Sequence, residues 1–221
     1  YTKVEPKRLP EWGCGDKLLV LPISDLHFNM QATVFNSGNE YNCDIAEKLF
    51  FHVIADVLER TNRHKLSQII LTIGGDQMDA DNIANTTTKG TPQNCDMNYL
   101  DACERLYDMT VRAVEILAER APVTVIYVPG NHDKLTGYKL AKYVDAWFRE
   151  DDRVVVDYSP LPRHYYVWGK TLFVFAHDGD VKRLQKLIPD EAREWWSGVQ
   201  YTEVMLQHLH SENVLSEDCN M

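Results

Sequence analysis

The sequence predicts an α/β fold for a single domain that spans residues 1–221. Two observations carry this prediction. Short apolar runs that are typical of buried strands alternate with longer segments in which apolar residues recur with helical period. Later in the chain, two strand-like runs are joined through Gly169 and Lys170, which indicates a hairpin and therefore a mixed or second sheet. A chain of 221 residues is long enough to bury the core of such a domain.

The strand-like runs are short and apolar, and in chain order they occupy residues 17–24, 68–73, 123–128, 154–156, 165–168 and 172–175. The helical segments, of which the last two are short, occupy residues 44–61, 100–119, 137–148, 181–187 and 190–196. We expect Asp44, with Glu47 three residues later, to cap the first helix. Residues 80–98 are polar and rich in turn formers. They predict a long loop insertion that is either functional or disordered.

Composition excludes several classes of protein. Hydrophobic residues make 44% of the chain and charged residues 25%, which excludes disordered and collagen-like chains. No apolar run reaches the roughly 18 residues that a membrane helix needs, so we expect no membrane partner. The net charge of −10 argues against a non-specific nucleic-acid coat but not against a nucleic-acid enzyme, because bound metal cations would invert the local field. Five cysteines without a CxxC pair predict a reducing, cytoplasmic location rather than disulfides.

Several strand-like runs are followed by side chains that commonly bind metal ions. These residues are Asp25 and His27, Asp76 and Asp79, Asn131 and His132, and His177, with His208 and His210 near the C-terminus. The carboxyl ends of strands are where α/β sheets bind ligands, so we expect these distant clusters to converge on one rim. Each cluster alone is more typical of a turn, a cap or a surface strand. Their occurrence in order at strand ends is what indicates a site.

The donor atoms of these clusters are carboxylate and amide oxygens and imidazole nitrogens, with no thiolate. Such a set suits Mn, Fe, Zn or Mg. Two divalent metal ions bridged by one carboxylate would satisfy all the clusters at once. Paired metals about 3.5–4 Å apart stabilise the attacking and leaving oxygens of an in-line displacement at phosphorus. The residues therefore predict a phosphate-ester substrate.

With these clusters in order, the chain resembles the calcineurin-like metallophosphoesterases, whose five motifs match the stretch between Asp25 and His210. The resemblance implies a four-layer α/β/β/α sandwich, in which two mixed sheets are flanked by helices. It also implies a two-metal site between the strand ends, with Mn as the expected metal and Fe, Zn or Mg as alternatives.

By motif, the resemblance implies a role for each of the site residues. Seven of them would be metal ligands: Asp25, His27 and His210 for one metal, Asn131, His177 and His208 for the other, and Asp76 for both. Two would be catalytic: His132, near the leaving group, and Asp79, which would orient the imidazole of His132.

The chain departs from the family pattern in two places. Gln207 stands where the last motif usually has glycine, which leaves the ligands intact but changes how closely the backbone can pass the metal. Only eleven residues follow His210, whereas family members usually continue with further strands. We therefore expect the chain to be truncated at its C-terminus or to belong to a longer protein.

The motif details indicate the phosphodiesterase and DNA-repair exonuclease branch. Serine/threonine protein phosphatases of the family carry Arg-Gly after the second motif, where this chain has Ala80 and Asp81. They carry Asn-His-Glu in the third motif, which in this chain ends in Asp133 instead. No arginine stands near either motif to bind a phosphate dianion, so we expect a diester of DNA or of a nucleotide. The loop 85–93 resembles, more weakly, an insertion in phage- or mobile-element-borne members. A phosphomonoesterase and a non-catalytic metal-binding scaffold are the alternatives.

Two further features have a structural and a functional interpretation. Several basic residues are candidates for a basic stripe near the site, although ordinary solvated surface is the simpler interpretation. They are Lys89, Lys134, Lys139, Lys142, Lys182, Arg183 and Lys186. Trp195 and Trp196 would form either part of the core or a stacking platform for a base.

Overall fold

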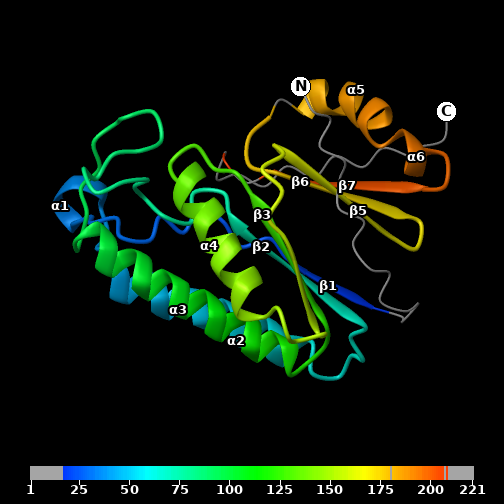
Figure 1. Ribbon diagram of the computed structural model, residues 1–221, viewed down its shortest axis with the longest axis horizontal. Coiled ribbons are helices and arrows are strands. Elements are labelled where there is room, and N and C mark those ends of the chain that lie inside the picture. Colours follow the sequence, from blue (N-terminus) through cyan, green and yellow to red (C-terminus); the bar gives the residue numbers. More distant parts are fainter. Residues whose placement is uncertain (1–16, 180, 207, 209–221) are drawn as a thin grey trace.

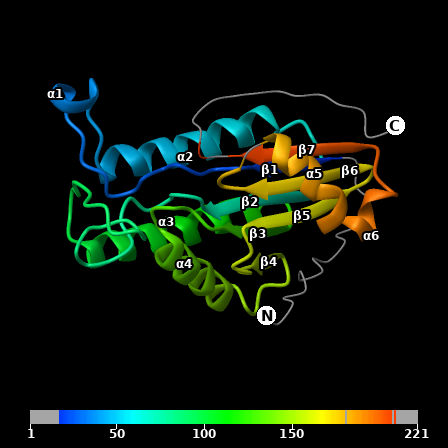
Figure 2. The same cartoon turned by 90° about the horizontal axis from the view of Figure 1, so that it is seen from above.

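The computed structural model describes residues 17–179, 181–206 and 208, and it shows four layers (Figure 1). Two sheets pack face to face. Three long helices cover the outer face of the larger sheet, and two shorter helices cover the outer face of the smaller one (Figures 1 and 2). The predicted α/β/β/α sandwich is therefore confirmed.

The larger sheet contains four strands in chain order: β1 (Leu18–Leu21), β2 (Gln68–Gly74), β3 (Val123–Val128) and β4 (Val154–Asp157). All neighbouring pairs in this sheet are parallel. The sequence analysis expected both sheets to be mixed, and for this sheet the described residues show otherwise. The reason is that a helical crossover connects each pair of consecutive strands. It returns the chain to the end of the sheet where the previous strand began, so the next strand runs parallel to it.

The helices α2 (Cys43–Arg60), α3 (Tyr99–Ala118) and α4 (Lys134–Trp147) pack their apolar faces on the larger sheet. A single-turn helix, α1 (Val34–Ser37), precedes them. The expected cap of α2 was wrong by two residues, because Asn42 is the N-cap and its Oδ1 accepts from the backbone N–H of Ile45 at 3.0 Å.

The side chains of Asp44 and Glu47, which the sequence analysis assigned to the α2 cap, bind Arg105 of α3 instead. The Arg105 guanidinium donates to Asp44 Oδ1 at 2.7 Å and to Glu47 Oε2 at 2.8 Å. The two carboxylates therefore connect helices rather than terminate one.

The smaller sheet is mixed, as expected. Strands β5 (Arg163–Trp168) and β6 (Thr171–Ala176) form the predicted hairpin, and β7 (Tyr201–Leu206) lies parallel to β6. The sequence analysis missed β7, because this edge strand is only half-buried and has no apolar alternation. Between β6 and β7 lie α5 (Val181–Glu191) and α6 (Arg193–Trp196). Trp195 and Trp196 pack against the core beneath these helices, which favours the structural interpretation of the pair.

Residues 80–98 contain no strand or helix, and an isolated bridge pairs Thr86 with Pro92. Within the described ranges, none of the helices combines the length and the apolar character that crossing a membrane requires. The described cysteines, Cys43, Cys95 and Cys103, are free thiols.

The two sheets are joined by an apolar layer that contains one buried polar bridge. Ile70, Ile126 and Val128 of the larger sheet pack against Tyr166 and Phe175 of the smaller one. Within this layer the hydroxyl of Tyr166 donates to Gln68 Oε1 at 2.6 Å, and Gln68 Nε2 donates to Thr124 Oγ1 at 2.6 Å. The bridge satisfies a fully buried amide and fixes how β5 sits over β2.

We predict that Tyr166→Phe lowers the free energy of unfolding by about 1–3 kcal/mol, because it leaves the buried Gln68 carbonyl oxygen without its donor. Tyr165→Phe is the matched control, since that hydroxyl binds the exposed Glu191 carboxylate, and its effect should stay within about 0.5 kcal/mol. Chemical denaturation of both variants measures the difference. Equal stabilities would show that the bridge between the sheets contributes nothing.

Candidate metal centre

The predicted site residues follow strands of both sheets, and the fold brings those strand ends together. Asp25 follows β1, Asp76 follows β2, Asn131 follows β3 and His177 follows β6. The larger sheet thus contributes three loops and the smaller sheet one. The backbone N–H of His208 donates to the His177 carbonyl oxygen at 2.9 Å, which places His208 at the same rim.

The loops after β1 and β2 leave their strands through sharp turns that are paired with each other. Asp25, His27 and Asp76 have positive φ angles of 51°, 45° and 61°. A positive φ is uncommon for residues other than glycine and costs of order 1–3 kcal/mol. The turns are held by backbone hydrogen bonds from Asp25 N to the Gly75 carbonyl at 2.9 Å and from His27 N to the Asp76 carbonyl at 3.0 Å. The strained conformation directs both carboxylates toward the rim.

A buried carboxylate that the sequence analysis did not assign to the site holds the Asp76 turn from behind. Asp133 is fully buried, and its two oxygens accept from the backbone N–H groups of Asp76 at 3.2 Å and of Met78 at 3.1 Å. Burial raises the pKa of Asp133 to about 7. The sequence shows Asp133 only as the last residue of the third motif, Gly-Asn-His-Asp, and assigns it no role of its own. The missing information was its burial, which the sequence does not show.

The Asp76 carboxylate lies at the middle of the rim. Its Oδ1 accepts from the backbone N–H of His132 at 2.6 Å, and its Oδ2 lies 3.1 Å from His177 Nε2. His177 Nε2 also lies 3.0 Å from Asn131 Oδ1, and since both neighbours are acceptors this nitrogen carries a proton when no metal is bound. Burial raises the pKa of Asp76, but the hydrogen bonds from His177 and His132 outweigh it and hold the pKa below its ordinary value. Ligand atoms from three motifs therefore converge on one point.

Two groups of potential metal ligands share Asp76. One contains Asp25, His27 and Asp76, the other contains Asp76, His177 and His208, and within each group the donor atoms lie within 4.8 Å of one another. The donors are carboxylate oxygens and imidazole nitrogens, which suit hard or borderline divalent cations. The buried His177 Nδ1 makes no hydrogen bond within the described part of the chain. The residues thus fit two divalent metal ions around a shared carboxylate. His210, the remaining predicted ligand, lies outside the described residues.

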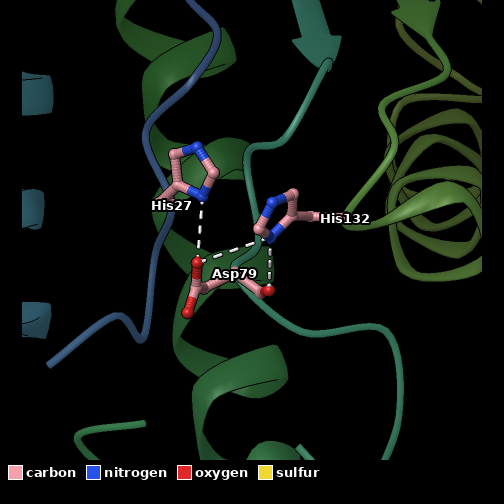
Figure 3. Close-up of side chains that lie close together, drawn as sticks. All are labelled: His27, Asp79 and His132. Atoms are coloured by element: carbon pink, nitrogen blue, oxygen red, sulfur yellow. Dashed lines mark hydrogen bonds and ion pairs between the residues drawn. The ribbon is translucent and has the colours of Figure 1, made fainter. Parts of the chain in front are cut away.

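Asp79 joins the two histidines beside this centre (Figure 3). Its carboxylate Oδ1 lies 2.9 Å from His27 Nδ1, and its backbone carbonyl oxygen lies 2.9 Å from His132 Nδ1. The carboxylate is farther from His132 Nδ1, at 3.6 Å. The shortest contact to His132 thus comes from the backbone of Asp79, the residue that was expected to orient this imidazole.

These contacts determine which ring nitrogens are available for chemistry. A carbonyl oxygen only accepts, so His132 Nδ1 carries a proton and Nε2 is left for a substrate. His27 donates from Nδ1 to Asp79 in the same way, which leaves its Nε2 as the ligand atom. Burial lowers the pKa of His27, but the hydrogen bond and the charge of Asp79 outweigh burial and raise it.

Comparison with known families identifies the fold and the chemistry together. A model of the calcineurin-like phosphoesterases matches residues 18–219. The chain belongs to the calcineurin-like phosphoesterase family. The comparisons with curated proteins and with solved structures returned no significant match.

This membership accounts for the centre described above. Calcineurin-like phosphoesterases are metal-dependent hydrolases of phosphate esters, so the chain is a metal-dependent phosphoesterase and its substrate is a phosphate ester. The Asp and His groups at the rim are positioned to bind divalent metal.

In this calcineurin-like phosphoesterase, Gly130 packs so closely against Asp76 and Asp133 that the position has no room for a side chain. A Cβ at Gly130 would lie 2.3 Å from both the backbone N and the carboxylate Oδ1 of Asp76, and 2.5 Å from Asp133 Oδ1. We predict that Gly130→Ala displaces Asp76, weakens Mn²⁺ binding at least tenfold and lowers stability by about 1–3 kcal/mol, as overpacking does. Gly198→Ala is the matched control, since its nearest neighbour would be 3.5 Å away.

Calorimetric Mn²⁺ titration and thermal unfolding of both variants test this prediction. Metal affinity that is unchanged in Gly130→Ala would mean that the close packing around Asp76 is not needed to form the centre.

Proposed function

We propose that the protein is a phosphodiesterase that hydrolyses a diester of DNA or of a nucleotide. The observation that carries the proposal is the charge of the cavity beside the centre. Among the described residues that line this cavity, Lys89 is the one lysine, and arginine is absent from them. A monoester presents a phosphate dianion, which favours bidentate binding by arginine, whereas a diester carries a single negative charge. One lysine together with bound metal ions suits the diester better.

The metal-binding roles in this proposal follow the two ligand groups. Asp25, His27 and His210 would hold one metal ion, Asn131, His177 and His208 would hold the other, and Asp76 would contact both. When bound, two such ions supply Lewis-acid activation of water and neutralise charge on the phosphoryl oxygens. Mn²⁺ is the metal that we propose, because the donor set combines carboxylate oxygens with imidazoles.

His132 would be the general acid. Water attacks phosphorus in line with the leaving oxygen and releases one proton to the solvent, so that a new P–O bond forms while the bond to the leaving alcohol breaks. The electron pair of the broken bond stays on the leaving oxygen. His132, with protons on both ring nitrogens, would donate its Nε2 proton there and keep the Nδ1 proton that the Asp79 carbonyl accepts. His132 lines the cavity, and the Asp79 carbonyl holds its Nδ1 at 2.9 Å, so that Nε2 is the nitrogen left for the substrate.

We also propose a compartment for the enzyme, on the basis of its cysteines. The free thiols of Cys43, Cys95 and Cys103 suit a reducing environment, so we place the enzyme in the cytoplasm. DNA and nucleotide diesters are available there.

A paired rate assay tests the proposed function. We predict that chelator-treated protein regains activity with Mn²⁺ and then hydrolyses bis-p-nitrophenyl phosphate faster than p-nitrophenyl phosphate. Asp76→Asn is the blank, because the loss of a charge shared by both ligand groups should reduce metal binding at each. A faster monoester rate would identify a phosphatase. Full metal content without any metal-dependent rate would identify a non-catalytic scaffold.

We predict that His132→Ala retains its metal but loses about 10²–10⁴-fold in rate, the usual contribution of general acid–base catalysis. The comparison variant is His27→Ala, which should lose metal as well as activity, since His27 shares a ligand group with Asp25 and Asp76, whereas His132 groups only with His27 and Asp79. Metal analysis and kcat measured on the same samples separate the two roles. If His132→Ala lost its metal, the acid role assigned to His132 would have to be abandoned.

A further inference from the structure

A cavity of about 260 Å³ opens beside the candidate metal centre. Asn131, His132 and His208 line it on the side of the centre. The 80–98 loop lines it with four side chains, those of Thr87, Lys89, Thr91 and Gln93, and Asp178 completes the described lining. A long loop without strand or helix thus supplies half of the residues that surround the space next to the proposed acid.

The loop is folded into a fixed turn at this position. The backbone N–H of Thr87 donates to the Thr91 carbonyl at 2.9 Å, and the N–H of Gly90 donates to the Thr87 carbonyl at 2.9 Å. Gly90 has a φ of +89°, a conformation that glycine adopts readily. Lys89 therefore lies at the tip of a closed turn, between two threonines that face the cavity.

The turn is also attached to the catalytic side of the cavity. The backbone N–H of Thr88 donates to the carbonyl oxygen of His132 at 3.1 Å, and its hydroxyl donates to Asp81 Oδ2 at 2.7 Å. Asp81 in turn accepts from the backbone N–H groups of Leu135 and Thr136 at the start of α4. These contacts hold the turn that carries Lys89 against the backbone of His132 and the start of α4.

The chemistry of the lining selects a class of ligand. Its described residues offer two hydroxyls, two side-chain amides, an ammonium, a carboxylate and imidazoles, and none of them is aliphatic or a phenyl or indole ring. Such a surface binds hydroxyl groups and one anion, and it lacks the large phenyl and indole rings on which bases stack most strongly. The volume lies below the range of about 300–1,000 Å³ for drug-sized ligands, so one small unit fills it.

We infer that this turn forms the subsite for the leaving alcohol, and that the alcohol is a sugar or polyol that carries a second phosphate. The inference rests on the proposed phosphodiesterase function, which places His132 beside the leaving oxygen. Lys89 binds the second phosphate as a point charge. Thr87, Thr91, Gln93 and Asp178 bind hydroxyl and ring oxygens of the same unit. The next nucleotide of a nucleic-acid strand has this chemistry.

The first test uses the full chain with Mn²⁺ and three forms of a thymidine dinucleotide: without a terminal phosphate, with a 3′-phosphate and with a 5′-phosphate. The wild type should prefer one phosphorylated form about tenfold in kcat/KM, mainly through KM. Lys89→Gln should lose most of that preference. Lys65→Gln should keep it, because Lys65 is an exposed lysine that precedes β2 and so lies at the end of the strand opposite to the site.

The second test measures binding without catalysis. Calorimetric titration of the full chain without added metal should show that ribose 5-phosphate binds about tenfold more weakly to Lys89→Gln than to the wild type or to Lys65→Gln. Unphosphorylated ribose should not distinguish the variants.

The outcomes separate this inference from the proposed function. If diesters are hydrolysed but Lys89→Gln keeps both the substrate preference and the ribose 5-phosphate affinity, the subsite is overturned and the function stands. If no diester is hydrolysed but ribose 5-phosphate binding depends on Lys89, the proposed function and the leaving-alcohol role are overturned, and only a sugar-phosphate binding site at Lys89 stands.

Discussion

The position of the Asp76 carboxylate is the constraint on which the centre depends, because groups from several separate segments hold it. Its own backbone N–H is held by the buried Asp133, its Oδ1 accepts from His132 N, and its Oδ2 faces His177 Nε2. Gly130 packs so closely that a Cβ there would overlap Asp76. The turn after β2, the loop after β3 and the end of β6 therefore determine each other, and none can move without displacing the carboxylate shared by both ligand groups.

The four-layer fold is what brings these segments together. A single parallel sheet would align the ends of β1, β2 and β3, but His177 comes from the other sheet. The apolar layer between the sheets, with its Tyr166–Gln68 bridge, sets how the two sets of strand ends meet. Packing far from the rim therefore controls distances at the rim, because close-packed interiors transmit small displacements.

The metal ligands and the proposed substrate contacts come from different kinds of structure. The ligands lie at strand ends and in tight turns with strained backbones, where their positions are fixed by the sheets. The cavity wall comes from the 80–98 loop, which is attached at His132 and at the start of α4. Loops carry specificity on a rigid scaffold in many enzymes. A change at Lys89 can thus alter which ester is bound while the turn around Asp76 stays intact.

The sequence by itself determined the α/β class, most of the strands and helices, and the ordered motifs that mark the chain as a calcineurin-like phosphoesterase. These features are local: apolar periodicity and residue types within a few positions. Only the tertiary structure decided that the larger sheet is parallel, that Asn42 rather than Asp44 caps α2, and that Asp133 is buried behind Asp76. It also decided which oxygen of Asp79 meets His132. The Asn42 cap is a local contact with Ile45 that Asp44 obscured. The other facts depend on contacts between residues that are distant in the sequence, such as Asp133 with Asp76 and Asp79 with His132, which are more than 50 positions apart, and no short pattern in the sequence encodes a distance of that kind.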